Sequence, residues 1–419
     1  MTTLSSPSLA VKKTNLNESK VPPYQLPDPL VATDGTHITT PEEWTTKRRP
    51  EILRLFETEV YGRAPEQKPE LQFQVDTEDH SALSGKAVRK QVTIRVSTPR
   101  GILPLHLLLY APKDKPHAPA FLGLNFLGNQ AVHTDPVIML SPAWIHGKPG
   151  SGIVDSHATE ASRGSEASRW QVEKLIDRGY ALATMACGDI DPDFDDGFQN
   201  GPHPLFYRDG QTKPDADQWG TIAAWAWGLS RALDYLERDD LVDARRVAVI
   251  GHSRLGKTAL WAAATDPRFA MAISNNSGCG GAALSKRIFG ETVGLINKNF
   301  PHWFCTNFRK YDDNEDQLPV DQHMLIALIA PRPVYVASAA EDKHADPLGE
   351  FLATKNAEPA YKLFNEPGLG TETLPAVDHP TGTGAMRYHI RTGKHDITAY
   401  DWDQYLNFAD QQLTAKSPK

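Results

Sequence analysis

Residues 251–258 fit two unrelated catalytic patterns. They read Gly-His-Ser-Arg-Leu-Gly-Lys-Thr, and this matches the phosphate-binding loop G-x-x-x-x-G-K-[ST] at every fixed position. The stretch also follows the β-branched segment "RVAVI" and leads into "KTALWAAAT", so Ser253 stands at a strand-to-helix turn, where a nucleophile elbow presents its serine. The first pattern indicates nucleotide binding, and the second indicates acyl transfer through Ser253.

The phosphate-loop interpretation fits the chemistry less well. Such a loop is ordinarily rich in glycine, because successive backbone N–H groups must curl around the phosphates, whereas His, Ser, Arg and Leu separate the two glycines here. It also needs an acidic partner for Mg²⁺ at the end of a neighbouring strand, and "VYVASAAED" offers one only after several small residues. A nucleotide-binding protein that uses Lys257 and Thr258 remains a remote alternative.

The elbow interpretation requires an acid and a histidine later in the chain. The apolar strand predicted at 332–342 ends in Glu341-Asp342, and we prefer Asp342 as the carboxylate that orients the histidine. Its other possible role is a helix cap or a solvated charge. The elbow has one departure: Gly256 lies three residues after the serine instead of two, so we expect strand and helix to cross with slightly more room.

His395 is the preferred base because it lies in a short loop between the last predicted strand and an amphipathic C-terminal helix. The order Ser253, Asp342, His395 is the order of the α/β-hydrolases. His379 and His389 are rivals, and His389 lies inside the strand, where a structural role is expected. A capping role for His395 is the remaining alternative.

This triad predicts a defined reaction. The histidine takes the serine proton, the alkoxide attacks an ester carbonyl, and water releases the acyl-enzyme. The backbone N–H of Arg254 is the expected oxyanion donor, with a second donor from "LNFLGN", near Asn125 to Asn129. The cations Arg254 and Lys257 beside the serine suggest an electron-rich or acidic acyl group.

The spacing and order of apolar segments along the sequence predict the strands and helices that position these residues. Closely spaced strands at 86–96, 103–112 and 119–128 suggest an antiparallel edge. Later apolar strands alternate with helices, which is the pattern of a buried parallel sheet; they read "YALATMACG", "RVAVIGHS", "FAMAISNNSG" and "RPVYVASAAED".

The clearest predicted helix spans 219–238. It places one apolar face in the core, made of Ile222, Trp225, Leu229, Leu233 and Leu236. Residues 1–35 are predicted to form a surface arm, and 36–419 a single α/β domain. The loop 141–170 is long and rich in Gly and Ser, and it is expected either to shape a binding surface or to decorate the exterior.

Composition excludes several classes of protein. The 419-residue chain carries a formal net charge of −8 and no run of Lys or Arg, which argues against nucleic-acid and anionic-membrane partners. No apolar stretch is long enough to span a membrane. The first residues do not form a signal peptide, so the protein is either cytoplasmic or a mature form whose leader has been removed. Three cysteines permit at most one disulfide, and Cys279 with Cys305 is the pair in question.

The acidic stretch "DIDPDFDDG" (189–197) has the spacing of a Ca²⁺ loop at its start. Asp196 stands where the loop needs Gly, and no Glu closes the loop. No metal is therefore expected there.

At "GHSRLGKTAL" the sequence resembles the bacterial glucuronoyl esterases of carbohydrate esterase family 15. The resemblance continues through "GDIDPDF", "RIFGETVGLIN", "PHWFC", "DQHMLIALIAPRPVYVASAAED" and "ADPLGEF". It implies an α/β-hydrolase three-layer sandwich with a mostly parallel central sheet. It also implies a serine mechanism without metal or cofactor, acting on esters that join 4-O-methyl-glucuronic acid of xylan to lignin alcohols.

The resemblance also implies residue roles. Ser253 would be the nucleophile, His395 the base and Arg254 the support of the oxyanion. Lys257 and Glu291 would contact sugar hydroxyls, and Trp303 and His344 would complete the substrate-binding set.

Two positions depart from the family pattern. Asn276 stands where some members carry a catalytic Glu, so Asp342 must serve alone. His344 replaces a tryptophan, which affects the expected platform for sugar stacking.

We expect a secreted or periplasmic monomer with a carbohydrate ester as its partner. Two alternatives remain open: an acetyl or other small-ester carbohydrate esterase on the same fold, and a carbohydrate-binding pseudoenzyme.

Overall fold

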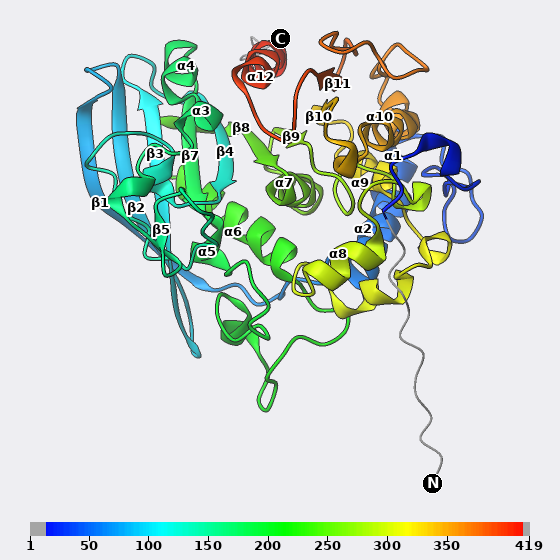
Figure 1. Ribbon diagram of the computed structural model, residues 1–419, viewed down its shortest axis with the longest axis horizontal. Coiled ribbons are helices and arrows are strands. Elements are labelled where there is room, and N and C mark those ends of the chain that lie inside the picture. Colours follow the sequence, from blue (N-terminus) through cyan, green and yellow to red (C-terminus); the bar gives the residue numbers. More distant parts are fainter. Residues whose placement is uncertain (1–13, 414–419) are drawn as a thin grey trace.

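A computed structural model describes residues 14–413 of the chain. A twisted sheet forms the middle layer, and helices cover both of its faces (Figure 1). One face packs against α3, α4 and α12, and the other packs against α2, α6, α7, α9 and α10. The predicted three layers are therefore present.

The main sheet has the strand order β1-β2-β3-β7-β4-β8-β9-β10-β11 within the described residues. From β7 to β11 neighbouring strands are parallel, whereas β1, β2, β3 and β7 pair antiparallel. The strands are β1 (Glu70–Ala82), β2 (Ala87–Thr98), β3 (Gly101–Pro112), β4 (Ala118–Asn125), β7 (Ala181–Ala186), β8 (Val242–His252), β9 (Met271–Asn275), β10 (Val334–Ala339) and β11 (Met386–Arg391).

The α-helices differ greatly in length. They are α1 (Pro41–Glu43), α2 (Arg49–Glu59), α3 (Ala167–Trp170), α4 (Val172–Asp177), α5 (Cys187–Ile190), α6 (Thr221–Leu236), α7 (Arg254–Thr265), α8 (Val293–Asn299), α9 (Gln322–Ala327), α10 (Pro347–Asn356), α11 (Glu358–Lys362) and α12 (Ala399–Gln412). The helix predicted at 219–238 is α6, and all five residues of its predicted apolar face are buried.

The prediction of a three-stranded antiparallel edge is wrong at its third strand. β4 does not pair with β3, because β7 lies between them, antiparallel to β3 and parallel to β4. The five-residue link 113–117 still suffices, since an extended chain of that length reaches roughly 17 Å and two strand spacings need about 10 Å. All eight residues of β4 are buried, as expected of a strand covered on both faces.

β1 is the strand that the sequence did not indicate. Its sequence "ELQFQVDTEDHSA" is polar and mostly exposed, so it lacks the apolar signal of a buried strand. The loop 141–170 is also more ordered than its composition suggests, because β5 (Ile153–Val154) pairs with β6 (His157–Ala158).

Residues 14–35 follow the surface and contribute one 3₁₀ turn, Glu18–Lys20. Among residues 14–413 no helix is both long and apolar enough to cross a membrane.

Candidate active site

Ser253 lies at a sharp turn between β8 and α7. β8 ends at His252, α7 begins at Arg254, and Ser253 has φ of 58°, a strained backbone angle for a residue with a side chain. Its N–H donates to the carbonyl of Asn275 at 2.9 Å. This is the geometry of a nucleophile elbow.

The strand and helix cross closely at this turn, and not with the extra room that was predicted. A Cβ on Gly251 would lie 1.8 Å from the carbonyl oxygen of Leu255, and one on Gly256 would lie 3.0 Å from the carbonyl oxygen of Gly251. A side chain at Gly251 would therefore collide with the backbone at the start of α7.

The groups that a phosphate loop would use are already occupied. The buried Lys257 ammonium donates to the carbonyls of Ser277 and Cys279 at 2.5 and 2.6 Å. The buried Thr258 hydroxyl donates to the carbonyl of Arg254. Two of the three Lys257 N–H donors and the Thr258 hydroxyl are thus committed to backbone carbonyls, which does not suit a loop that binds phosphate and Mg²⁺.

His395 and Asp342 meet as the sequence predicts. His395 Nδ1 is 2.5 Å from Asp342 Oδ2, and the Asn276 amide donates to the same oxygen at 3.0 Å. Burial alone would raise the pKa of Asp342, but the hydrogen bond and charge of His395, together with Asn276, hold this pKa below its usual value. Glu341 is exposed, so Asp342 is the acid that faces the histidine.

The rival histidines lie elsewhere. His389 is fully buried in β11, with Nδ1 on the Tyr335 hydroxyl and Nε2 on the Asp401 carboxylate. His379 is exposed and contacts the carbonyl of Val377.

His252 adds a second imidazole, and its ring centroid is 4.5 Å from that of His395. Burial, reinforced by the charge of His395, keeps the pKa of His252 well below its usual value, so His252 stays neutral.

No hydrogen bond from the Ser253 hydroxyl is present among the described residues, although Ser253 and His395 line the same cavities. Such bonds often tighten only when substrate binds.

Arg254 is held by its surroundings. Its guanidinium lies over the rings of Phe126 and Trp303, at 5.1 and 5.3 Å from their centroids. Asp193 accepts from Arg254 Nη1 at 2.9 Å, from Trp303 Nε1 at 2.7 Å and from His302 Nε2 at 3.1 Å. Burial would raise the pKa of Asp193, but these donors and charges outweigh it and lower the pKa. Arg254 is thus fixed beside Ser253.

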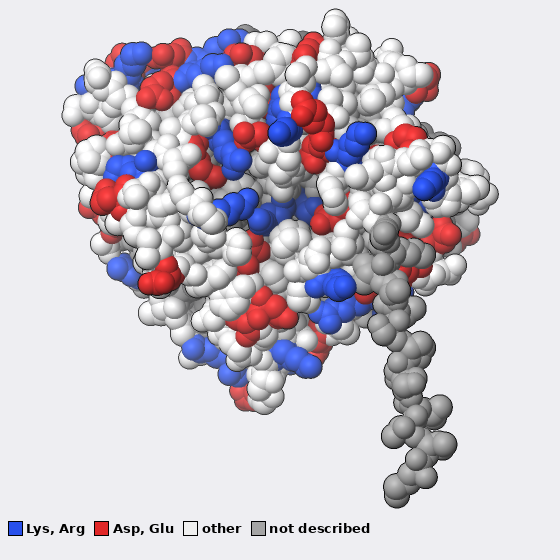
Figure 2. All heavy atoms as spheres, viewed as in Figure 1, with Lys and Arg blue, Asp and Glu red and all other residues white. Residues whose placement is uncertain are grey.

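Two cavities flank the serine. The Lys257 cavity, of about 330 Å³, is lined by the eight residues that the resemblance and the triad pattern favoured: Ser253, Arg254, Lys257, Glu291, Trp303, Asp342, His344 and His395. The Trp144 cavity, of about 420 Å³, shares Ser253, Arg254 and His395 and adds loop residues such as Trp144, His146 and Lys148. In Figure 2 basic side chains line the central hollow of this face, and acidic side chains lie beside them at its border.

The Lys257 cavity has a polar wall. Glu291 Oε2 is 3.7 Å from Lys257 Nζ, and His344 is exposed. Trp303 is 4 % exposed and stacks on Phe300 with the ring planes 1° apart. Because its N–H is already bonded to Asp193, Trp303 can offer a ligand only ring surface.

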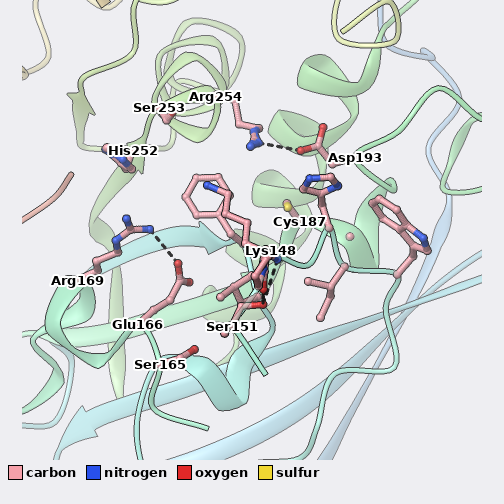
Figure 3. A pocket seen from close by; sticks show the side chains of 18 of the residues that line it. Lys148, Ser151, Ser165, Glu166, Arg169, Cys187, Asp193, His252, Ser253 and Arg254 are labelled. Atoms are coloured by element: carbon pink, nitrogen blue, oxygen red, sulfur yellow. Dashed lines mark hydrogen bonds and ion pairs between the residues drawn. The ribbon is translucent and has the colours of Figure 1, made fainter. Parts of the chain in front are cut away.

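The loop 141–170 shapes the Trp144 cavity, which is the first of the two roles expected for it. Figure 3 shows Lys148 and Ser151 of the loop across the cavity from Ser253 and Arg254. To the left of them in this view, Glu166 pairs with Arg169 at 3.0 Å, and Arg169 also reaches Asp396, the residue after His395.

The loop after β4 lies at the same end of the sheet. The side chains of Asn125 and Asn129 bond to each other, so they brace the loop. Phe126 and Leu127 line the Trp144 cavity and belong to the segment in which a second oxyanion donor was expected.

Sequence reasoning missed Asp193, although its motif was considered as a Ca²⁺ loop. The aspartates of that stretch serve separate partners: Asp189 contacts His106, Asp191 accepts from Thr221, and Asp196 accepts from backbone of its own loop.

Within residues 14–413 no three or more His, Cys, Asp or Glu side chains gather in a way that could hold a metal. Cys187, Cys279 and Cys305 are free and buried, so Cys279 and Cys305 form no disulfide.

A family profile and a similar protein of known sequence both place the chain among carbohydrate esterases. Residues 205–365 match the profile of the family described as glucuronyl esterase, fungi. A carbohydrate esterase from an unknown prokaryotic organism is 52% identical over 401 residues, which are 96% of this chain and 92% of that protein.

Solved structures of similar proteins point to the same family. A promiscuous family 15 esterase from a marine bacterial metagenome superposes with a TM-score of 0.90 at 51% identity and covers 96% of this chain and 100% of its own. The glucuronoyl esterase from Solibacter usitatus gives 0.89 at 50% identity, with 94% and 100% covered. The chain therefore belongs to carbohydrate esterase family 15, the glucuronoyl esterases, and has their α/β-hydrolase fold.

Proposed function

We propose that the protein is a serine esterase that hydrolyses esters of glucuronic acid, including its 4-O-methyl form. The observation that carries the proposal is the convergence of a serine elbow, a His395–Asp342 pair and a lysine–glutamate wall on one cavity. Two similar proteins support it by their names. One is the glucuronoyl esterase from Solibacter usitatus, and the other is a 4-O-methyl-glucuronoyl methylesterase from Podospora anserina, which matches over 28% of this chain.

The proposed steps follow from the geometry. His395 accepts the Ser253 proton as the serine oxygen bonds to the ester carbonyl carbon, and it then protonates the departing alcohol. His395 then takes a proton from water, the water oxygen attacks the acyl carbon, and His395 gives the proton to the Ser253 oxygen as the acyl-enzyme bond breaks. Asp342 accepts from His395 Nδ1, which leaves the other ring nitrogen to face the serine and stabilises the imidazolium.

Arg254 has two proposed roles at the oxyanion. Its backbone N–H follows the nucleophile, at the usual place for a donor, and its guanidinium is held near the reacting carbon by Asp193. A backbone N–H from the loop after β4, near Phe126 and Leu127, would be the second backbone donor.

We propose the Lys257 cavity as the site of the uronoyl group. Lys257 and Glu291 offer opposite charges to ring hydroxyls, His344 faces solvent at the rim, and Trp303 supplies ring surface. The Trp144 cavity then receives the alcohol.

The proposed function also includes a natural substrate, a location and an oligomeric state. We propose lignin-carbohydrate esters of glucuronoxylan as the natural substrate, a secreted or periplasmic location, and a monomer whose catalytic domain spans 36–419. Size-exclusion chromatography with light scattering checks the monomer, because a dimer would double the measured mass.

The test of function compares hydrolysis of benzyl glucuronate with release of acetate from an acetylated xylo-oligosaccharide, in the wild type and in Ser253→Ala. Turnover of the glucuronate ester alone is expected. The variant should lose roughly 10³-fold or more in kcat with the fold intact. Release of acetate only would instead identify a small-ester esterase, and binding without turnover by either protein would identify a pseudoenzyme.

A further inference from the structure

The described start of the chain lies against the outer side of the Lys257 cavity. The Gly290 N–H donates to the carbonyl of Asn15 at 2.8 Å, and the Asn15 amide donates to the carbonyl of Ile288 at 3.4 Å. Both carboxylate oxygens of Glu18 are 2.9 Å from Arg287 Nη2. Asn15 and Glu18 at the start of the described chain thus contact one short segment far away in the sequence, residues 287–290.

Arg287 links this contact to a second wall segment. Its side chain is only 4 % exposed, and its Nε lies 2.8 Å from Asp346 Oδ2. Asp346 is itself buried and accepts from the Gly349 N–H, which caps α10. The guanidinium therefore stands between Glu18 of the arm and Asp346 of the segment that follows β10.

The two segments meet directly at the cavity. The Glu291 N–H donates to the carbonyl of His344 at 3.0 Å. A Cβ on Gly290 would lie 2.4 Å from that same carbonyl oxygen, so the backbones are in tight contact. The side chains of Glu291 and His344 both line the Lys257 cavity. A shift of 287–290 would therefore move both side chains.

We propose that Asn15 and Glu18 act as positioning residues for uronoyl binding. They touch no substrate; through Gly290 and Arg287 they fix the wall that carries Glu291 and His344. This inference rests on the proposed function.

Ser253 and His395 are supported independently of the arm, and Asp342, which shares the turn with His344, is also held by Asn276 and His395. Ser253 is set by the turn after β8, and His395 by a loop that Arg391 holds through the carbonyls of Lys394 and Asp396. Loss of the arm contacts should therefore weaken binding of the acyl group and leave the chemical step largely unchanged.

The experiment compares two truncated proteins, one without residues 1–20 and one without residues 1–13. The second is the matched control because it keeps Asn15 and Glu18. The substrates are benzyl glucuronate, which has the uronoyl group, and p-nitrophenyl acetate, which lacks it. We expect the KM for benzyl glucuronate to be about tenfold higher in the longer truncation, with kcat within about twofold and acetate hydrolysis equal in both. Glu18→Gln in the full chain should raise the same KM about threefold.

Two results would overturn the inference. Equal KM values in both truncated proteins would make the arm a passive covering, and an equal loss on both esters would make it a general support of the fold. Failure of the proposed function looks different, because the full chain would then hydrolyse the acetate and not the glucuronate ester, and the inference would fall with it.

Discussion

The two cavities beside Ser253 are built in opposite ways. In the Lys257 cavity, Lys257 and Trp303 are buried and each is bonded to other parts of the protein. The rim of the Trp144 cavity is made of His146, Lys148 and other exposed loop residues. Fixed polar groups discriminate between ligands because their geometry cannot adapt. The difference suggests strict selection of the acyl group and looser selection of the alcohol.

The largest expected effect lies at the centre that both cavities share. Asp342→Asn should lower kcat about 10³-fold on every ester, since an amide no longer stabilises the imidazolium and can favour the wrong tautomer of His395. Steady-state kinetics on benzyl glucuronate and p-nitrophenyl acetate measure it.

Glu341→Gln is the matched control for this change, because Glu341 is exposed, and it should keep nearly full activity. Near-normal turnover by the Asp342 variant would mean that another acid orients His395 and stabilises its imidazolium.

The next effect is confined to one cavity. Lys257→Met keeps the apolar stem and removes the charge, which leaves the carbonyls of Ser277 and Cys279 and the Glu291 carboxylate without their partner. We expect kcat/KM for benzyl glucuronate to fall roughly 10 to 100-fold, and that for p-nitrophenyl acetate to change much less.

Circular dichroism checks that the Lys257 variant is folded. An equal fall on both esters would mean that Lys257 supports the elbow as a whole, and would remove the distinction between the two cavities at this residue.

A buried acid behind the Lys257 cavity makes stability depend on pH. The Glu350 carboxylate accepts from the N–H groups of Ser277 and Gly278 and from the Ser338 hydroxyl. Burial raises its pKa to about 8. A folded-state pKa raised above that of the unfolded chain means that the folded protein binds the extra proton, so this contribution is full at low pH and is lost as pH rises towards 8.

Glu350→Gln should remove this dependence. The free energy of unfolding of the wild type should fall more between pH 5 and pH 9 than that of the variant, by about 1 to 3 kcal/mol. Urea unfolding of both proteins at the two pH values measures the difference. Parallel curves for the two proteins would show that Glu350 does not titrate in this range.

The sequence predicted the parts of this site that local chemistry determines. Ser253 follows a glycine at the end of an apolar strand, and Asp342 and His395 follow later strands, so chain order and strand ends were enough to select them. The family and the α/β-hydrolase fold were also predicted and are confirmed.

Contacts between distant segments could not be predicted in the same way. Asp193 holds Arg254 across 61 positions and Trp303 across 110, and nothing near Asp193 in the sequence indicates either partner. The insertion of β7 between β3 and β4 was missed for the same reason, since the short link between those strands suggests direct pairing.

The smallest expected effect lies in the Trp144 cavity and tests its looser selection. Trp144 is half-buried, and its ring lies 4.4 Å from that of Phe194, so Trp144→Ala opens the cavity without removing a charge. We expect kcat/KM for benzyl glucuronate to fall about threefold relative to methyl glucuronate, because the benzyl ring loses contact surface and the methyl group does not reach it. The ratio of the two kcat/KM values measures this, and Lys257→Met is the control, because it should lower both values by the same factor. If Trp144→Ala also lowers both equally, the loop acts on the acyl group, and the two cavities do not divide the ester between them.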